Sequence, residues 1–354
     1  MIKWTVRIGY LFVLTGLIVG SLFITSYSDQ KPAKTLDVFC WGDFLGEELI
    51  AKFEEETHIK VNLHTCNSNE ELLLKMKKGG VPYDIIFPSD YAAALLIENH
   101  LLRPLDKSRL PFFASLSKQL CGQFFDRDNT YSVPFSWEAS LIAVNKKLGL
   151  DTSHVRDYSL LFSPPPHQLK LLSSQDAGEN FLTAAFYLFG NQEMLTSSQI
   201  KEVRSLLRKQ RTFVEAYCDY RAKYLFTKEH CMIGVGKSCL IDPILEENPQ
   251  IEFLFPETGI FVSLENVAVP VSAKASEENI YKFINFVFRP ENMALHIDTA
   301  SMFPSLQESL LYTRKRSDYF KALPARILDN YPILFYKLVA SPSTIREVWV
   351  DVKS

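Results

Sequence analysis

Two short stretches of the sequence combine aromatic rings with carboxylates. They contain Trp41, Asp43 and Phe44 in one stretch, and Ser89, Asp90 and Tyr91 in the other. Flat aromatic faces beside carboxylates suit a cation that has lost its water. Each cation–π contact contributes about 0.5–2 kcal/mol, and each charge-assisted hydrogen bond about 1.5–3 kcal/mol. The alternative is structural, with Trp41 and Phe44 as core aromatics and Ser89 or Asp90 as a helix cap.

Both stretches follow predicted β-strands. The predicted elements are strands at 36–41, 59–63 and 85–87, with helices at 45–57, 70–78 and 92–98. This alternation of strand and helix predicts a parallel sheet with helices on both faces. Ligands bind in the crevice at the carboxyl ends of such strands, so the two stretches are expected to lie together there.

Length, charge and the first thirty residues limit the possible functions. With 354 residues, 47% of them hydrophobic, the chain is long enough for two domains. A balance of 38 basic and 41 acidic residues gives no electrostatic footprint for nucleic acid. Lys3 and Arg7 precede an uncharged run at 8–24, so residues 1–28 are predicted to be an export signal or an uncleaved anchor. The body is therefore expected outside the cytoplasm, where the six cysteines could pair in ways that their spacing does not fix.

The second half of the chain offers a further acidic pair. Asp176 is a plausible cap for a helix that follows a strand at 169–172, and Glu179 lies on the same face of its first turn. The helix N-terminus would stabilise both residues as anions, so capping at a solvated face is the alternative to ligand contact.

Motifs for catalysis are missing from the sequence. Residues 234–238 resemble a phosphate loop, but that motif needs a glycine at the position of Cys231, so a strand-to-helix turn is expected there. The seven histidines are scattered, and neither His-Glu-x-x-His nor Gly-x-Ser-x-Gly occurs. We therefore expect no enzyme activity, no cofactor and no metal site.

Four segments resemble the spermidine/putrescine-binding proteins of bacterial ABC polyamine transporters in order and spacing. They are residues 41–44, 53–61, 83–91 and 131–145. The resemblance implies an α/β, two-lobed periplasmic-binding-protein fold, in which each lobe is a mainly parallel sheet flanked by helices. Two crossing segments, near residues 131–145 and 266–270, would join the lobes. Residues 35–138 and 267–308 are then expected to form the first lobe, and residues 139–266 and 309–354 the second.

The same resemblance implies a monomeric receptor in the periplasm. It would bind a polyamine of the putrescine or spermidine class between its lobes and deliver it to ABC permease subunits in the inner membrane. Asp176 and Glu179 match an acidic pair that contacts the polyamine nitrogens in the family. The implied ligand-binding residues are Trp41, Asp43, Phe44, Ser89, Asp90, Tyr91, Trp137, Asp176, Glu179, Glu265 and Phe303.

The chain also departs from the family pattern. Glu265 stands where family members carry an aspartate, and the tryptophans expected near Val235 and near Ser263 are missing. The charge pattern is therefore better kept than the aromatic walls. This leaves open a second reading, in which the same fold binds a different organic cation or an amino acid.

Overall fold

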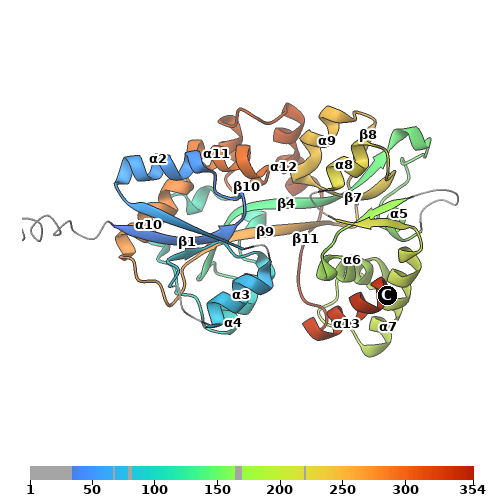
Figure 1. Ribbon diagram of the computed structural model, residues 1–354, viewed down its shortest axis with the longest axis horizontal. Helices are drawn as coiled ribbons and strands as arrows, with labels where there is room; N and C mark the ends of the chain where they lie inside the picture. Colours follow the sequence, from blue (N-terminus) through green and yellow to red (C-terminus); the bar gives the residue numbers. More distant parts are fainter. Residues whose placement is uncertain (1–33, 67, 79–81, 164–169, 219–220) are drawn as a thin grey trace, which may run out of the picture.

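Two long antiparallel strands run across the middle of the molecule and connect its two lobes (Figure 1). They are β4 (Ser132–Asn145) and β9 (Ile260–Ala268). The two strands pair along most of the length of β9, with a register shift near Pro134. Nearly every residue of β4 is buried, as the apolar sequence of this crossing segment predicts.

The computed structural model describes residues 34–66, 68–78, 82–163, 170–218 and 221–354. The predicted export signal and the three prolines at 164–166, for which the sequence predicts a rigid loop, lie outside the described residues. Within the described part of the chain, no helix combines the length and the apolar character that a membrane span requires.

The first lobe begins with the predicted alternation of strands and helices. Its early elements are β1 (Thr35–Trp41), α2 (Glu47–Thr57), β2 (Lys60–Cys66), α3 (Asn69–Lys78), β3 (Ile85–Ile86) and α4 (Asp90–Glu98). β1 pairs in parallel with both β2 and β3, and β3 pairs antiparallel with β9. The outer strands are thus parallel, and the crossing strands make the antiparallel pairs.

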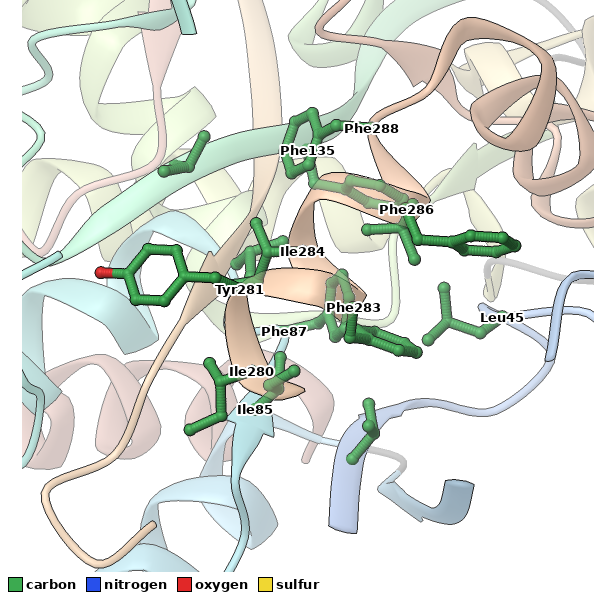
Figure 2. Packing of buried hydrophobic residues seen from close by; sticks show 14 of the residues in the cluster. Leu45, Ile85, Phe87, Phe135, Ile280, Tyr281, Phe283, Ile284, Phe286 and Phe288 are labelled. Atoms are coloured by element: carbon green, nitrogen blue, oxygen red, sulfur yellow. The ribbon is translucent and has the colours of Figure 1, made fainter. Parts of the chain in front are cut away.

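Helices from late in the sequence complete the core of the first lobe. They are α10 (Glu277–Val287) and α11 (Pro290–Ala300), which follow β9 along the chain. Figure 2 shows Phe283 and Ile280 of α10 beside Phe87 and Ile85, in one buried hydrophobic cluster. The Phe53 ring of α2 lies 5.0 Å from the Phe283 ring, so the early and late parts of the chain share this core.

The second lobe has its own parallel strands. They are β5 (Leu171–Ser173), β6 (Val214–Tyr217) and β7 (Ile233–Lys237), with β8 (Ile251–Leu254) and β11 (Ile333–Phe335) paired to the crossing strands. Its helices are α5 (Ser159–Phe162), α6 (Ala177–Phe189), α7 (Ser197–Arg211), α8 (Ala222–Thr227), α9 (Ile241–Glu247), α12 (Asp318–Asn330) and α13 (Pro342–Lys353). The main sheet order, β2-β1-β3-β9-β4-β7-β5-β6, makes one continuous sheet through both lobes.

The sequence predicts a helix at 215–224, and the structure shows that this prediction is wrong. The structure has strand β6 and then the short helix α8 in its place. β6 pairs in parallel with β5, and Val214 is buried while Glu215 faces solvent. Pairing with β5 thus outweighs the local preference for a helix. The sequence did not indicate this strand, because four residues are too few to show the alternation of a strand. The strand-to-helix turn at 234–238, by contrast, is confirmed, since β7 runs directly into a short 3₁₀ turn.

Candidate ligand-binding site

A cavity of about 210 Å³ is lined by residues from both lobes. From the first lobe come Asn69, Glu70, Ser89, Asp90 and Tyr91, at the starts of α3 and α4. From the second lobe come residues 176–182 at the start of α6 and a group between residues 336 and 346 before and within α13. Ser263 of β9 completes the lining. The cavity therefore lies where strand ends, helix starts and a crossing strand meet.

Asp90 is a buried carboxyl group that forms no ion pair with a described residue. It opens α4 and is 2% exposed. Its Oδ1 accepts a hydrogen bond from the Tyr91 backbone N–H at 2.8 Å, whereas its Oδ2 has no partner within the described part of the chain. Burial raises the pKa of Asp90 from 3.8 to about 8, because water no longer stabilises the carboxylate. The backbone N–H groups of Tyr91, Tyr336 and Leu264 offset only part of this rise.

Glu265 of β9 is the second buried carboxyl group beside the cavity. The backbone of Glu265 forms an isolated antiparallel β-bridge with Ser89. The Glu265 Oε2 atom accepts a hydrogen bond from Trp41 Nε1–H at 2.6 Å. Burial raises the pKa of Glu265 to about 8; the bond from Trp41 opposes this rise and the charge of Asp90 adds to it. Asp90 and Glu265 therefore repel each other when both are ionised.

Asp176 and Glu179 lie together at the start of α6, as predicted. The Asp176 side chain caps the helix, accepting a hydrogen bond from the Glu179 backbone N–H at 2.8 Å, so the capping interpretation is confirmed. Both residues also line the cavity. Loss of water around the carboxylate, and then the charge of Glu179, raise the pKa of Asp176. Capping and a place at the cavity are thus compatible.

A lysine that the sequence analysis missed pairs with Glu179. Lys237 Nζ lies 2.5 Å from Glu179 Oε1 and 3.5 Å from Glu138 Oε1, and it is 5.5 Å from the centre of the Tyr336 ring. Lys237 is 7% exposed. Burial alone would lower the pKa of Lys237, but the surrounding carboxylates raise it well above its usual value. In the sequence, Lys237 appears only within the rejected phosphate-loop resemblance at 234–238, which gives no sign of a partner for it.

The predicted aromatic residues fall into two groups. Tyr91 lines the cavity, and its hydroxyl donates a hydrogen bond to Glu70 Oε1 at 2.9 Å. Trp41 is half-buried and reaches the site through its bond to Glu265. Phe44, by contrast, is 3% exposed and packs against the rings of Phe87 and His296 in the first lobe's core.

Trp137 and Phe303 are likewise buried within the protein. Their rings lie 4.8 Å apart, and Trp137 Nε1–H donates a hydrogen bond to the Pro304 carbonyl oxygen at 3.1 Å. Neither residue lines the cavity, and the same holds for Phe44 and for the exposed Asp43. The structure thus brings together Ser89, Asp90, Tyr91, Asp176 and Glu179 on the cavity, with Trp41 and Glu265 next to them.

The segment before and within α13 was also missed as a source of site residues. It supplies apolar side chains, Leu338, Val339 and Ile345, and two cations, Lys337 and Arg346. Carboxylates and aromatic groups therefore face an apolar and basic side of the same cavity. Within the described residues, no group of three or more histidine, cysteine or acidic side chains is arranged to hold a metal ion.

Comparison with known proteins gives consistent matches. The family model described as bacterial extracellular solute-binding protein matches residues 48–326. The spermidine/putrescine-binding periplasmic protein of Escherichia coli is 28% identical over 259 residues, which are 73% of each chain. The putrescine-binding periplasmic protein SpuD of Pseudomonas aeruginosa is 28% identical over 290 residues, covering 77% of this chain and 78% of that protein.

Solved structures match the fold over most of the chain. The spermidine/putrescine ABC transporter substrate-binding protein PotD of Streptococcus pneumoniae has a TM-score of 0.74 at 23% identity, covering 90% of this chain and 98% of that one. The predicted two-lobed α/β periplasmic-binding-protein fold is therefore confirmed. The matching family model spans well over half of the chain and describes solute-binding receptors, not enzymes. This chain belongs to the bacterial extracellular solute-binding protein family.

Proposed function

We propose that this protein is the solute receptor of an ABC transporter and that it binds a polyamine of the putrescine or spermidine class between its two lobes. The observation that carries the proposal is Asp90, a buried carboxyl group on a cavity lined by both lobes, with one oxygen that lacks a partner among the described residues. A ligand ammonium has three N–H donors and a positive charge; it would supply a partner for the second oxygen and the positive charge that no described residue places in an ion pair with Asp90.

The ligand amine would bind most strongly beside Asp90 and Glu265. Its charge favours the ionised form of both carboxyl groups, so binding would release the protons that burial holds on them at neutral pH. When the lobes close, water leaves the cavity and each ammonium–carboxylate interaction strengthens. Micromolar affinity needs only about 8 kcal/mol, which a few such contacts supply.

The remaining site residues would have distinct roles. Tyr91 would lie along the methylene chain, and Asp176 and Glu179 would face the other end of the ligand. Trp41 would act as a positioning residue, because its N–H holds the Glu265 carboxylate. Phe44, Trp137 and Phe303 would stabilise the lobes and their junction without touching the ligand.

The names of the relatives support the wider setting. We infer that the receptor works as a monomer in the periplasm, exported or tethered by residues 1–28, and passes its ligand to permease subunits in the inner membrane without chemical change. The hinge would lie where β4 and β9 cross, near the predicted lobe boundaries at residues 138 and 266. The alternative is another organic cation or an amino acid. Of these two, Lys337 and Arg346 on the cavity lining favour the amino acid, whose carboxylate they would face.

The first test measures thermal shifts with five amines: putrescine, cadaverine, spermidine, spermine and agmatine. Arginine and lysine are tested separately, because they represent the alternative ligand class. A saturable rise in Tm with one of the amines supports the proposal by mass action. A rise with an amino acid alone would assign the alternative ligand class. Unchanged amine affinity in the double variant Asp176→Asn, Glu179→Gln would contradict the proposed site, and Asp128→Asn, at an exposed residue, is the control.

A further inference from the structure

Lys237 of the second lobe is a buried cation that lies behind the lining of the proposed amine site. Lys237 is the last residue of β7, and its register partner is Ser140 of β4, so the sheet fixes its backbone. Its Nζ lies 2.5 Å from Glu179 and 3.5 Å from Glu138. A buried lysine without partners would lose its proton, but two carboxylates keep this one charged.

We propose that Lys237 is a specificity-determining residue that limits the charge of the ligand, so that the receptor selects a diamine over a triamine. This inference rests on the proposed function. Lys237 neutralises one carboxylate charge on the second-lobe side before any ligand arrives. Because the Lys237 ammonium already neutralises this negative charge, a third ammonium of the ligand would be attracted less strongly to the second-lobe side.

Lys237 acts through Glu179 and not by touching the ligand. Glu179 and Tyr336 line the cavity, whereas Lys237 does not. Lys237 holds Glu179 Oε1, and Glu179 Oε2 is buried without a hydrogen-bond partner among the described residues. Because Glu179 lines the cavity, a ligand ammonium that approaches it there also comes near the fixed positive charge of Lys237, which repels it.

The charges along the cavity differ between its two sides. Within the described part of the chain, no lysine, arginine or histidine pairs with Asp90 or Glu265. The second-lobe side, by contrast, has Lys237 behind it and Lys337 and Arg346 on its lining. One ammonium is therefore drawn to the Asp90 end, and a second is tolerated near Asp176. Each further positive charge meets increasing repulsion.

The test compares Lys237→Met with Lys147→Met. Lys147 forms an ion pair of the same 2.5 Å length with Glu229, but on the exposed surface. Calorimetric titration gives the Kd of putrescine and of spermidine for the wild-type protein and for each variant, after circular dichroism has checked folding. We expect the wild-type protein to bind putrescine more tightly, and Lys237→Met to shift the ratio of the two Kd values about tenfold toward spermidine.

The outcomes separate this inference from the proposed function. A shift of threefold or more toward spermidine in Lys237→Met, with less than twofold change in Lys147→Met, supports the inference. A smaller or opposite shift, equal shifts in both variants, or a wild-type preference for spermidine overturns it and leaves the amine site standing. No binding of any amine by the folded wild-type protein overturns the proposed function as well. If Lys237→Met does not fold, Lys237→Gln, whose neutral amide can still donate to Glu179, must show the same shift.

Discussion

Replacing Asp90 by asparagine should stabilise the ligand-free protein and weaken its amine binding. Asparagine has almost the same shape as aspartate, but it does not ionise. The ligand-free protein holds the Asp90 carboxyl group 2% exposed, without a cation among its described partners. The residue therefore opposes folding and serves ligand binding, so the two properties should change in opposite directions.

The size of the gain depends on pH. The pKa of Asp90 is about 8 in the folded protein, against 3.8 when it is exposed. At about 1.4 kcal/mol per pH unit, a charged Asp90 costs the folded protein on the order of 6 kcal/mol. Between pH 4 and pH 8 the unfolded chain has lost this proton and the folded protein keeps it, so folding takes up a proton and the free energy of unfolding falls as pH rises. In the Asp90→Asn variant this contribution to the pH dependence is absent. The free energy of unfolding of the variant should therefore exceed that of the wild type by near zero at pH 4 and by about 2–5 kcal/mol at pH 8.

Chemical denaturation at pH 5, 6, 7 and 8 tests this for the wild-type protein, Asp90→Asn and Asp128→Asn. The Asp128→Asn control removes an exposed carboxylate and should stay within about 0.5 kcal/mol of the wild type at every pH. Calorimetry should show at least a tenfold weaker amine affinity for Asp90→Asn. A stability difference that stays constant with pH, or an Asp90→Asn protein that is less stable at pH 8, would refute the assignment of Asp90 as an uncompensated buried acid.

Three further predictions concern the site and its surroundings. Amine affinity should rise from pH 6 to pH 8 by up to about tenfold per unit for each proton released from Asp90 and Glu265; equal heats of binding in buffers of different ionisation enthalpy would contradict this. Trp41→Phe removes the N–H donor of Glu265 and should weaken amine binding by about 1–3 kcal/mol, with the midpoint of the pH profile moved upward. Asp126→Asn should cost about 2–4 kcal/mol of stability in denaturation, because its carboxylate accepts the backbone N–H groups of residues 130–132, yet leave the amine Kd unchanged.

The sheet and the loops at its carboxyl ends could be predicted because they depend on local patterns. Strand Ile85–Ile86 ends before Pro88, and Asp90 opens the following helix, as the short apolar run and its polar neighbours indicate. The cap at Asp176 is equally local, since it joins side chain and backbone three residues apart. Such features need no knowledge of the rest of the chain.

The roles of the aromatic residues could not be predicted in this way. Asp43 has a φ of 55°, a left-handed conformation that is uncommon for residues other than glycine, and the chain turns there before Phe44 enters the core. The sequence does not show that turn, so the direction of the Phe44 ring was unknown. Lys237 was missed for a different reason, because its closest partner, Glu179, lies 58 residues away in the sequence. Only the folded sheet brings the two together.

The late position of α10 and α11 in the sequence has a consequence for synthesis. The core of the first lobe combines Leu49 and Phe53 of α2 with Phe283 and Phe286 of α10. A growing chain that has not yet reached α10 therefore exposes the apolar face of α2 with nothing from that helix to cover it. The lobe that begins first can be completed only when most of the chain has been made, and β9 arrives just before that point. Folding should thus follow synthesis of almost the whole chain, and the two lobes, joined through shared strands, should then form in one cooperative step.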